Sequence, residues 1–436
     1  MRKQKLFIFE FVSGGGYNTS SLPTALFCEG YSMLKSIIED FYNQNFEIYT
    51  ILDRRIAFLG RYLKANQIVL VDENCNYLEK YENMLLKTDA CFIIAPEFSN
   101  ILYELTEIAT SYEKAIFSIG LEGIKLGTSK MRTYEFFKRS NIPTPETYLI
   151  PTLNNRLDLD FIYDKFHELN QSVIIKPEDG VGAELVLYIN EKSQIEKLFG
   201  HNNLNLDISR TYIIQRYIRG IDMSISLIGI SDKNRQVEPF IFSVNAQNIY
   251  LPTGSIKSRY NGGMTPAVIS RKTQNSLKKF LHKLDFSYFK GYFGIDFLLT
   301  PNDSIKFIEI NPRLTTSYLG IRKIYTTNPL ELLLRSRNKK IRKIFHHPDY
   351  ISEYYRLDLK YTGKETINLI REKITPKLLK EIPELITPPI LLHKTHTDNY
   401  SCFIATKARD IATSKQQRNK IIEQLRNYDF IQLNGE

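Results

Sequence analysis

The first 120 residues alternate between short apolar runs and segments with the 3.6-residue repeat of a helix. Lys5 to Val12 is the first apolar run, Ser13 to Gly16 interrupts it, and Leu22 to Phe41 has helical periodicity. The expected strands that follow cover residues 47–51, 67–71, 91–95 and 115–118, and the expected helices cover 77–86 and 99–111. Strands that alternate with helices in this way predict a doubly wound α/β domain with a parallel sheet.

Polar residues stand at the carboxyl ends of several of these strands, the edge at which open α/β sheets bind ligands. Glu10 and the backbone amides of Gly14 to Gly16 are candidates to face a substrate, and a plain tight turn is the alternative. The glycine loop lacks the GxGxxG spacing of a dinucleotide site. Asp53 to Arg55 and Glu97 also follow strands, and each group by itself is expected to be a set of solvated loop charges.

Further along the chain, the pattern predicts a β-hairpin that contains three oxygen-bearing side chains. Residues 291–299 and 305–310 are apolar runs separated by the turn sequence Pro-Asn-Asp-Ser. Asp296 interrupts the first strand, whereas Glu309 and Asn311 lie two apart on the second and therefore share one face. A carboxylate in an apolar strand is unfavourable unless it is paired or binds a cation. Two carboxylates and an amide oxygen suit Mg²⁺; the alternative is a hairpin whose polar edge faces water.

Two lysines and two glycines precede this hairpin in places that suit an anion. Lys130 opens a predicted helix over residues 131–140, where a surface lysine is the alternative, and Lys176 ends an apolar strand. A charge at the end of such a strand is unfavourable unless an anion is near. Gly180 and Gly182 allow the backbone to approach phosphate oxygens closely, although no Walker motif follows them.

Taken together, these segments resemble the ATP-grasp superfamily, whose members join a carboxylate to an amine through an acyl phosphate. The resemblance rests above all on Asp296 followed by Glu309-Ile310-Asn311-Pro312-Arg313, and it covers about residues 125–330. It implies ATP as cosubstrate and Mg²⁺ or Mn²⁺ on Asp296, Glu309 and Asn311. The nucleotide-binding residues that it implies are Lys130, Lys176, Gly180, Gly182, Gln215, Tyr217, Ile218 and Asp222.

Within that set, the resemblance gives the lysines and glycines to the phosphates. Gln215 and the backbone through Ile218 would pair with the adenine edge, and Asp222 would hold the ribose hydroxyls. Taken alone, this segment is only a strand, a turn and a second strand over residues 223–230. The order of the four segments along the chain favours the nucleotide site.

The positive charge near the transferred phosphate must come from an unusual place in this chain. Many ATP-grasp enzymes have a basic residue two positions before the metal aspartate, where this sequence has Gly294. The expected catalytic residues are therefore Arg313, a fixed-charge fork for phosphate or carboxylate, and Lys257. Lys257 lies in a polar loop predicted over residues 255–263, where a solvated charge is equally expected. Strands over 240–244 and 247–251 and a surface helix over 273–284 are expected around it.

The N-terminal sequence narrows the expected substrates. Five short segments are similar to the archaeal ligases that join tyramine to glutamate in methanofuran synthesis, namely FEFVSGG, residues 29–34, 53–55, 95–97 and 260–263. The implied reaction joins a small-molecule carboxylate, glutamate, to an amine, tyramine, and releases ADP and phosphate. Two alternatives are an ATP-grasp ligase for another amino acid or peptide, and a nucleotide-binding regulator without catalysis.

Composition limits the other function classes. The chain has 436 residues, of which 43% are hydrophobic and 24% are charged, as in ordinary globular proteins. No window is apolar enough for a membrane span, and the apolar N-terminal run is expected to be a core strand rather than a signal peptide. The four cysteines of the chain are not spaced as in a metal site, and they predict reduced thiols in the cytoplasm. The resemblance also allows a homodimer.

The net charge of +10 is concentrated in the last hundred residues, so nucleic-acid binding is not expected near the predicted site. From Glu331 onward there are 20 Lys and Arg against 13 Asp and Glu. The basic run that begins at Arg335 is expected to be a solvated linker or helix face. His393 and His396 would point to opposite faces of a strand, which excludes a zinc site there. Strands over 390–394 and 401–407 and a helix over 414–426 are expected to follow.

The expected organisation has three parts. Residues 1–124 form a Rossmann-like, pre-ATP-grasp α/β domain, and residues 125–334 form the α+β ATP-grasp domain, with a mobile lid over about 145–215. Residues 335–436 form a small basic α+β extension at the C-terminus. No chemistry is predicted for this extension from its sequence.

Overall fold

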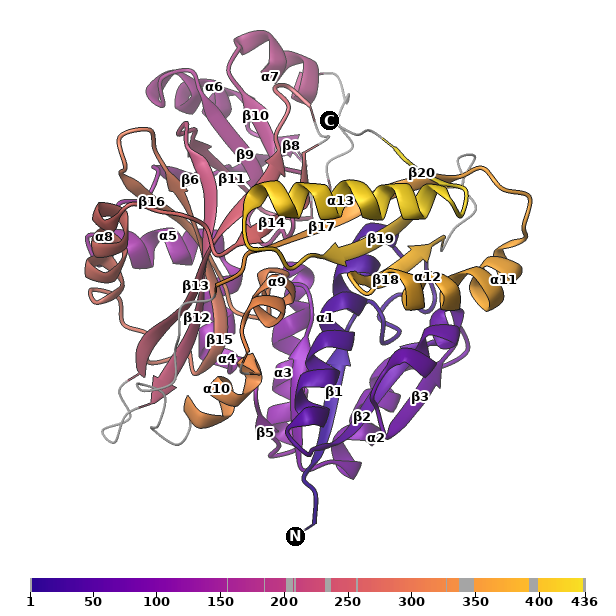
Figure 1. Ribbon diagram of the computed structural model, residues 1–436. Helices are drawn as coiled ribbons and strands as arrows, with labels where there is room; N and C mark the ends of the chain where they lie inside the picture. Colours follow the sequence, from indigo (N-terminus) through magenta and orange to yellow (C-terminus); the bar gives the residue numbers. More distant parts are fainter. Residues whose placement is uncertain are drawn as a thin grey trace.

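The protein is described from a computed structural model (Figure 1). The structure describes residues 2–154, 156–183, 185–200, 207, 209–231, 237–255, 258–326, 328–336, 349–391 and 399–433. Lys257, the basic run after residue 336 and the pair His393 and His396 lie outside these ranges. Among the described residues, no helix combines the length and apolar content that crossing a bilayer requires.

The N-terminal part is a five-stranded parallel sheet in the order β3-β2-β1-β4-β5. Its elements are β1 (Lys5–Glu10), α1 (Thr24–Asn43), β2 (Glu47–Asp53), η1 (Arg54–Tyr62), β3 (Gln67–Val71), α2 (Tyr77–Lys87), β4 (Ala90–Ile94), η2 (Phe98–Asn100), α3 (Ile101–Ser111) and β5 (Ala115–Ile116). This confirms the predicted doubly wound α/β arrangement. Residues 6–9 of β1 are fully buried, because helices cover both faces of a parallel sheet.

One expectation about this sheet is wrong. Asp53 and Glu97 were expected to be solvated loop charges, yet their exposed fractions are only 1% and 4%. Asp53 accepts hydrogen bonds from the backbone N–H and the guanidinium of Arg55, and Glu97 pairs with Arg313 at 2.8 Å. A buried carboxylate is tolerated when such donors surround it, and a local sequence pattern does not reveal a partner 216 residues away.

The middle part contains a four-stranded antiparallel sheet in the order β10-β9-β11-β6, with its own apolar core. Helices α6 and α7 lie beside this sheet at the top of Figure 1. The elements are α4 (Leu121–Thr128), α5 (Lys130–Arg139), β6 (Thr147–Leu149), β7 (Thr152–Leu153), β8 (Arg156–Leu157), α6 (Leu159–Glu168), β9 (Val173–Pro177), β10 (Leu187–Ile189), α7 (Lys192–Phe199) and β11 (Tyr212–Arg216). The predicted strand that ends at Lys176 and the predicted helix that Lys130 opens are confirmed.

The remaining residues build one large antiparallel sheet in the order β16-β15-β12-β13-β14-β17-β19-β18, with β20 beside β17. In chain order, the strands and helices of this part begin with β12 (Ile221–Ser231), β13 (Val237–Tyr250), β14 (Arg259–Thr265), α8 (Arg271–Leu281), β15 (Gly291–Leu299), β16 (Ile305–Asn311), α9 (Ser317–Ile324) and α10 (Pro329–Ser336). They continue with β17 (Ser352–Tyr361), α11 (Ile367–Leu369), the π-helical turn η5 (Ile370–Ile374), α12 (Thr375–Glu381), β18 (Leu385–Ile390), β19 (Asn399–Ala405), α13 (Ile411–Arg426) and β20 (Phe430–Gln432).

Within this sheet the predicted hairpin of β15 and β16 is confirmed, but two other expectations are wrong and one strand was missed. The strands expected over 240–244 and 247–251 are one strand, β13. The polar loop expected over 255–263 becomes β14 from Arg259 onward, because β13 on one side and β17 on the other satisfy its backbone groups. Strand β17 itself was not predicted, and it joins the C-terminal strands to the central sheet.

The C-terminal strands also pack against the first helix of the chain, α1 (Figure 1, yellow strands beside the indigo helix). The hydroxyls of Ser32 and Thr387 are 2.7 Å apart in a buried hydrogen bond, and Lys35 donates to the carbonyl of Ile386. Ile390 and Phe403 belong to the same apolar core as the N-terminal sheet. The C-terminal segment is therefore part of the main body of the fold.

Candidate active site

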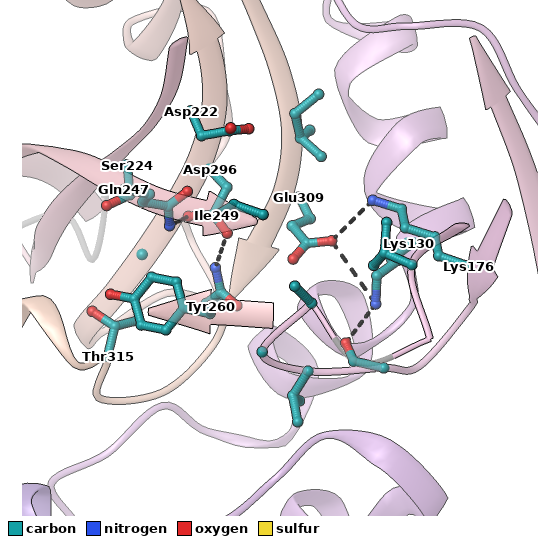
Figure 2. A pocket seen from close by; sticks show the side chains of 18 of the residues that line it. Lys130, Lys176, Asp222, Ser224, Gln247, Ile249, Tyr260, Asp296, Glu309 and Thr315 are labelled. Atoms are coloured by element: carbon teal, nitrogen blue, oxygen red, sulfur yellow. Dashed lines mark hydrogen bonds and ion pairs between the residues drawn. The ribbon is translucent and has the colours of Figure 1, made fainter. Parts of the chain in front are cut away.

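A cavity of about 450 Å³ lies where the three parts of the chain meet. Glu10 and Ile94 line it from the N-terminal sheet, and Lys176 lines it from the four-stranded sheet. Asp296 and Glu309 line it from the large sheet. Figure 2 shows these two carboxylates opposite the two lysines Lys130 and Lys176. The cavity thus brings together residues that the sequence analysis connected only through the resemblance.

The hairpin places its polar side chains as the alternation of strand residues predicts. Asp296 of β15 is directly across from Glu309 of β16, and Gly294 is across from Asn311. Asn311 donates from its side-chain nitrogen to Asp296 Oδ2 at 3.0 Å, and Gln247 of β13 donates to Asp296 Oδ1 at the same distance. A register shift follows the Asp296–Glu309 pair, because β16 has one extra residue there, Ile308, that has no partner on β15.

Both lysines lie against Glu309. Lys176 Nζ is 3.4 Å from Glu309 Oε2, and Lys130 Nζ is 3.8 Å from the same oxygen. Lys130 also donates to the carbonyl oxygen of Gly180 at 2.6 Å, which ties α5 to the loop after β9. Each lysine side chain is only 9% exposed. Two buried ammonium groups beside one carboxylate leave positive charge available for an anion in the cavity.

Burial and these neighbours shift the pKa values of the carboxylates in opposite directions. Burial, together with the nearby charge of Glu309, raises the pKa of Asp296 to about 7. Burial also acts to raise the pKa of Glu309, but the nearby charges of Lys130 and Lys176 outweigh it and lower that pKa. The pKa of Lys176 is lowered by burial, although Glu309 opposes the shift. Of these two carboxylates, Asp296 is therefore the one whose negative charge is less compensated by nearby lysines.

The donor set fits a small hard cation. Within the described residues, no three His, Cys, Asp or Glu side chains cluster as a metal site. The candidate ligands are instead two carboxylates and the Asn311 amide, whose oxygen would face a cation after a flip of the amide group. The high pKa of Asp296 indicates that its charge is poorly compensated by the protein alone. Mg²⁺ accepts few protein ligands when phosphate oxygens complete its shell, so these residues fit it.

The loop after β9 lies over this end of the cavity. Gly180 and Gly182 line the cavity, and Gly182 has a φ of +62°, a conformation that favours glycine. Asp179 accepts hydrogen bonds from the guanidinium of Arg210 and from the backbone of Ser99. Ser258 donates to the carbonyl of Ala183 at 2.9 Å. In this structure the loop therefore contacts both the N-terminal part and the large sheet.

The predicted adenine and ribose residues line another side of the same cavity. Tyr217 stacks on Tyr188 with ring centroids 4.1 Å apart, and Ile218 and Asp222 follow it along the wall. The Gln215 side chain donates to Thr147 at 2.8 Å, so this amide is engaged by the protein itself. Burial raises the pKa of Asp222 to about 6. Tyr188 was not a sequence candidate, because nothing in its own segment points to a stacking partner.

Several polar residues that line this cavity were not predicted from the sequence, and some predicted residues do not line it. Glu29 of α1, Gln247 of β13 and Tyr260 of β14 line it but were not site candidates. Glu29 and Tyr260 lie in segments that carry the resemblance but were given no role, and Gln247 lies outside those segments. Arg313 lines the cavity as expected and is held by Glu97. Glu10 lines it too, whereas Gly14 to Gly16 form tight turns with backbone bonds to β1 and the residue after it.

Comparison with known families agrees with this geometry. The sequence matches the ATP-grasp domain family over residues 128–317 and a pre-ATP-grasp domain family over residues 46–121. The chain is an ATP-grasp protein in which a pre-ATP-grasp domain precedes the ATP-grasp domain. It is an ADP-forming carbon–nitrogen ligase that acts on a carboxylate and an amine.

Two tyramine–L-glutamate ligases are similar to the chain over most of their lengths. The chain is 26% identical over 345 residues to the tyramine–L-glutamate ligase of Methanocaldococcus jannaschii, covering 77% of this chain and 90% of that protein. It is 24% identical over 341 residues to the same enzyme of Methanocaldococcus fervens, covering 77% and 94%. The crystal structure of a putative ATP-grasp superfamily protein from Archaeoglobus fulgidus superposes with a TM-score of 0.59 at 21% identity, covering 93% and 100%. That likeness supports the fold.

Proposed function

We propose that the protein joins glutamate to tyramine, with Mg²⁺ as the metal and an acyl phosphate as the intermediate. The observation that carries this proposal is the single cavity that extends from the buried lysines to the carboxyl ends of β1 and β4. Such a cavity holds a nucleotide at one end and a second, partly apolar substrate at the other. The similarity to the two Methanocaldococcus ligases supports the choice of substrates.

The nucleotide would lie along the wall formed by β9, β11 and β12. Lys130 and Lys176 would contact its phosphates as point charges, and the stacked ring of Tyr217 would lie near the base. Asp222, whose pKa is raised by burial, would accept hydrogen bonds from ribose hydroxyls. The loop over residues 178–183 would close on the phosphates, and the part over about 145–215 would act as the lid.

The first chemical step would be attack of a glutamate carboxylate oxygen on the γ-phosphorus of ATP. The new P–O bond forms as the bond to the β-γ bridging oxygen breaks, which gives the acyl phosphate and ADP. Arg313 and the two lysines would offset the negative charge of the transferred group. Mg²⁺ held by Asp296, Glu309 and Asn311 would supply further charge neutralisation at the phosphates.

In the second step the amine nitrogen would attack the acyl carbon, and the bond from that carbon to the phosphate oxygen would break. The products are the amide and inorganic phosphate. Because an acyl phosphate hydrolyses when water reaches it, the closed loop over residues 178–183 would keep turnover low until the amine is bound. No serine or cysteine nucleophile is needed in this scheme.

The test is a coupled assay of ADP release with glutamate, tyramine and ATP, combined with mass spectrometry of the product. We expect ADP and phosphate, with full turnover only when acid and amine are both present. Release of AMP would overturn the mechanism. Turnover with another amino acid–amine pair but not with this one would keep the ligase class and reject the substrates. ATP binding without turnover for any pair would favour a regulator.

A further inference from the structure

One end of the cavity is formed by the N-terminal sheet at its topological switch point. In the order β3-β2-β1-β4-β5, the chain runs outward from β1 and then returns to place β4 on its other side. Ligands of open α/β sheets bind at the carboxyl ends of the strands at such a point. Glu10 ends β1, Ile94 ends β4, and both line the cavity.

Negative charge exceeds positive charge among the described residues at this end. Glu10 and Glu29 line this end, and Glu97 and Asp358 lie next to it, so four carboxylates stand against two guanidinium groups. Asp358 accepts a hydrogen bond from Arg356 at 3.2 Å. Arg313 pairs with Glu97 at 2.8 Å, and Arg356 of β17 lies 3.6 Å from Glu29. No Lys or Arg of the described part lies within ion-pair distance of Glu10, whose exposed fraction is 2%. The charge balance therefore favours a cation in this part of the cavity.

The carboxyl group of Glu10 is held in one position by its surroundings. Its two oxygens accept hydrogen bonds from the backbone N–H groups of Val12 at 3.0 Å and Ser13 at 2.7 Å. Gly30 of α1 faces it so closely that an added Cβ would lie 2.5 Å from a carboxyl oxygen. Despite the two N–H donors, burial raises the pKa of Glu10 to about 7, so it can gain and lose a proton near neutral pH.

The walls around these carboxylates are apolar. Val12, Leu26, Met33 and Ile94 line this end and offer side chains for a hydrocarbon or aromatic group. A ligand with one ammonium group and an apolar body matches both the charge and the walls. A ligand with several carboxylates would have to enter against the negative charge.

We propose that this end of the cavity is the binding site of the amine substrate, and that Glu10 accepts the proton which the ammonium group must lose before it attacks. This inference rests on the proposed function and adds the site of the amine to it. The substrate class that the site fits is a primary arylalkyl or alkyl amine without a carboxylate. Glu29, held by Arg356, adds attraction for the ammonium group.

The proton transfer completes the second chemical step. An N–H bond of the ammonium group breaks, its proton binds a Glu10 oxygen, and the nitrogen lone pair becomes available. That lone pair forms the C–N bond at the acyl carbon while phosphate leaves with the electrons of the C–O bond. The second proton on nitrogen is lost with collapse to the amide, and the leaving phosphate can take it. Glu10 returns to its charged form when the product leaves.

The test compares two nucleophiles on the same acyl phosphate, tyramine and hydroxylamine. Hydroxylamine is largely uncharged at neutral pH and needs no proton acceptor before it attacks. We expect Glu10→Gln to lower amide formation with tyramine about a hundredfold, the usual scale for a lost general base, and to lower hydroxamate formation far less. Glu29→Gln should raise the KM for tyramine while it changes the KM for ATP little. Glu107→Gln, an exposed glutamate of α3, is the matched control.

The wild-type protein offers a second measurement in case Glu10→Gln does not fold. Because both products form from the same acyl phosphate, the ratio of amide to hydroxamate isolates the amine step, and this ratio should fall below about pH 7 as Glu10 is protonated. Equal loss of both products in Glu10→Gln, or the same pH limb for both nucleophiles, would overturn the assignment. Absence of hydroxamate from the wild type with glutamate would instead reject the proposed function, so the two failures are distinct.

Discussion

The two ends of the cavity use buried carboxylates in different ways. At the end that we assign to the phosphates, Glu309 lies beside Lys130 and Lys176. These three side chains together carry a positive charge that can bind an anion. At the other end, no Lys or Arg of the described residues lies within ion-pair distance of Glu10, although the charge of Arg313 acts on it, and backbone N–H groups hold its carboxylate. The contrast teaches that the partner of a buried carboxylate, more than its burial, indicates which ligand charge a site accepts.

The largest effect is expected from substitutions of the candidate metal ligands at the phosphate end. Asp296→Ala and Glu309→Ala should each lower turnover about a thousandfold or more, because the metal loses a carboxylate while the phosphates remain. Asn311→Ala should lose about tenfold, since water can replace a neutral ligand. The measurement is ADP release with both substrates saturating. Glu309→Ala at wild-type turnover would contradict the metal site, and Glu107→Ala serves as the control.

A smaller effect is expected from a substitution of Arg356 on β17, beside the end of the cavity that we assign to the amine. Burial raises the pKa of Glu29, and the nearby charge of Arg356 opposes that rise. Arg356→Met removes this partner, so the pKa of Glu29 should rise further. We expect the KM for the amine to increase about tenfold with little change in the KM for ATP, and Arg356→Lys to restore part of the loss. Arg426→Met, an exposed arginine of α13, is the control. Equal changes in both KM values would indicate a general structural defect.

The smallest effect concerns stability rather than turnover. Asp296 has a pKa of about 7 in the folded protein against an ordinary value of 3.8, so the folded state binds more protons between these values. Stability of the ligand-free protein should therefore fall as the pH rises from about 4 to about 7. Asp296→Asn should remove about 1 to 2 kcal/mol of that pH dependence, because one pKa unit corresponds to about 1.4 kcal/mol and Glu309 shares the shift.

Chemical unfolding of the wild type and of Asp296→Asn at several pH values measures this difference. Glu10 has its pKa raised in the same direction, so the wild-type slope contains both groups. The difference between the two proteins isolates Asp296. Identical slopes would show that Asp296 is already neutralised by its surroundings in the absence of metal.

The phosphate end could be predicted because its residues lie in short local patterns. Asp296 and Glu309 interrupt apolar strands of one hairpin, and Lys176 ends an apolar strand, so each was visible within about ten residues of sequence. The order of these segments carried the family resemblance. The parallel N-terminal sheet followed from the alternation of strands and helices in the same way.

At the end that we assign to the amine, only Glu10 was a sequence candidate, because the rest of its chemistry depends on contacts between distant segments. Glu29 looks like any charged residue of an amphipathic helix until β17 brings Arg356 to it. Glu97 was expected to be solvated because Arg313 lies 216 residues away. Tyr260 was expected in a polar loop, and its strand forms only because β13 and β17 flank it. Periodicity describes single elements, and these sites belong to none of them.

The contact between α1 and the C-terminal strands has a consequence for synthesis of the protein on the ribosome. The hydrogen bond between Ser32 and Thr387 joins residues 355 positions apart, so α1 emerges long before β18 and β19 exist. At synthesis rates of about 5 to 20 residues per second this interval is on the order of half a minute. During that time α1 can pack against β1 and β2, but its side that faces β18 and β19 lacks its native cover and exposes the nascent chain to aggregation.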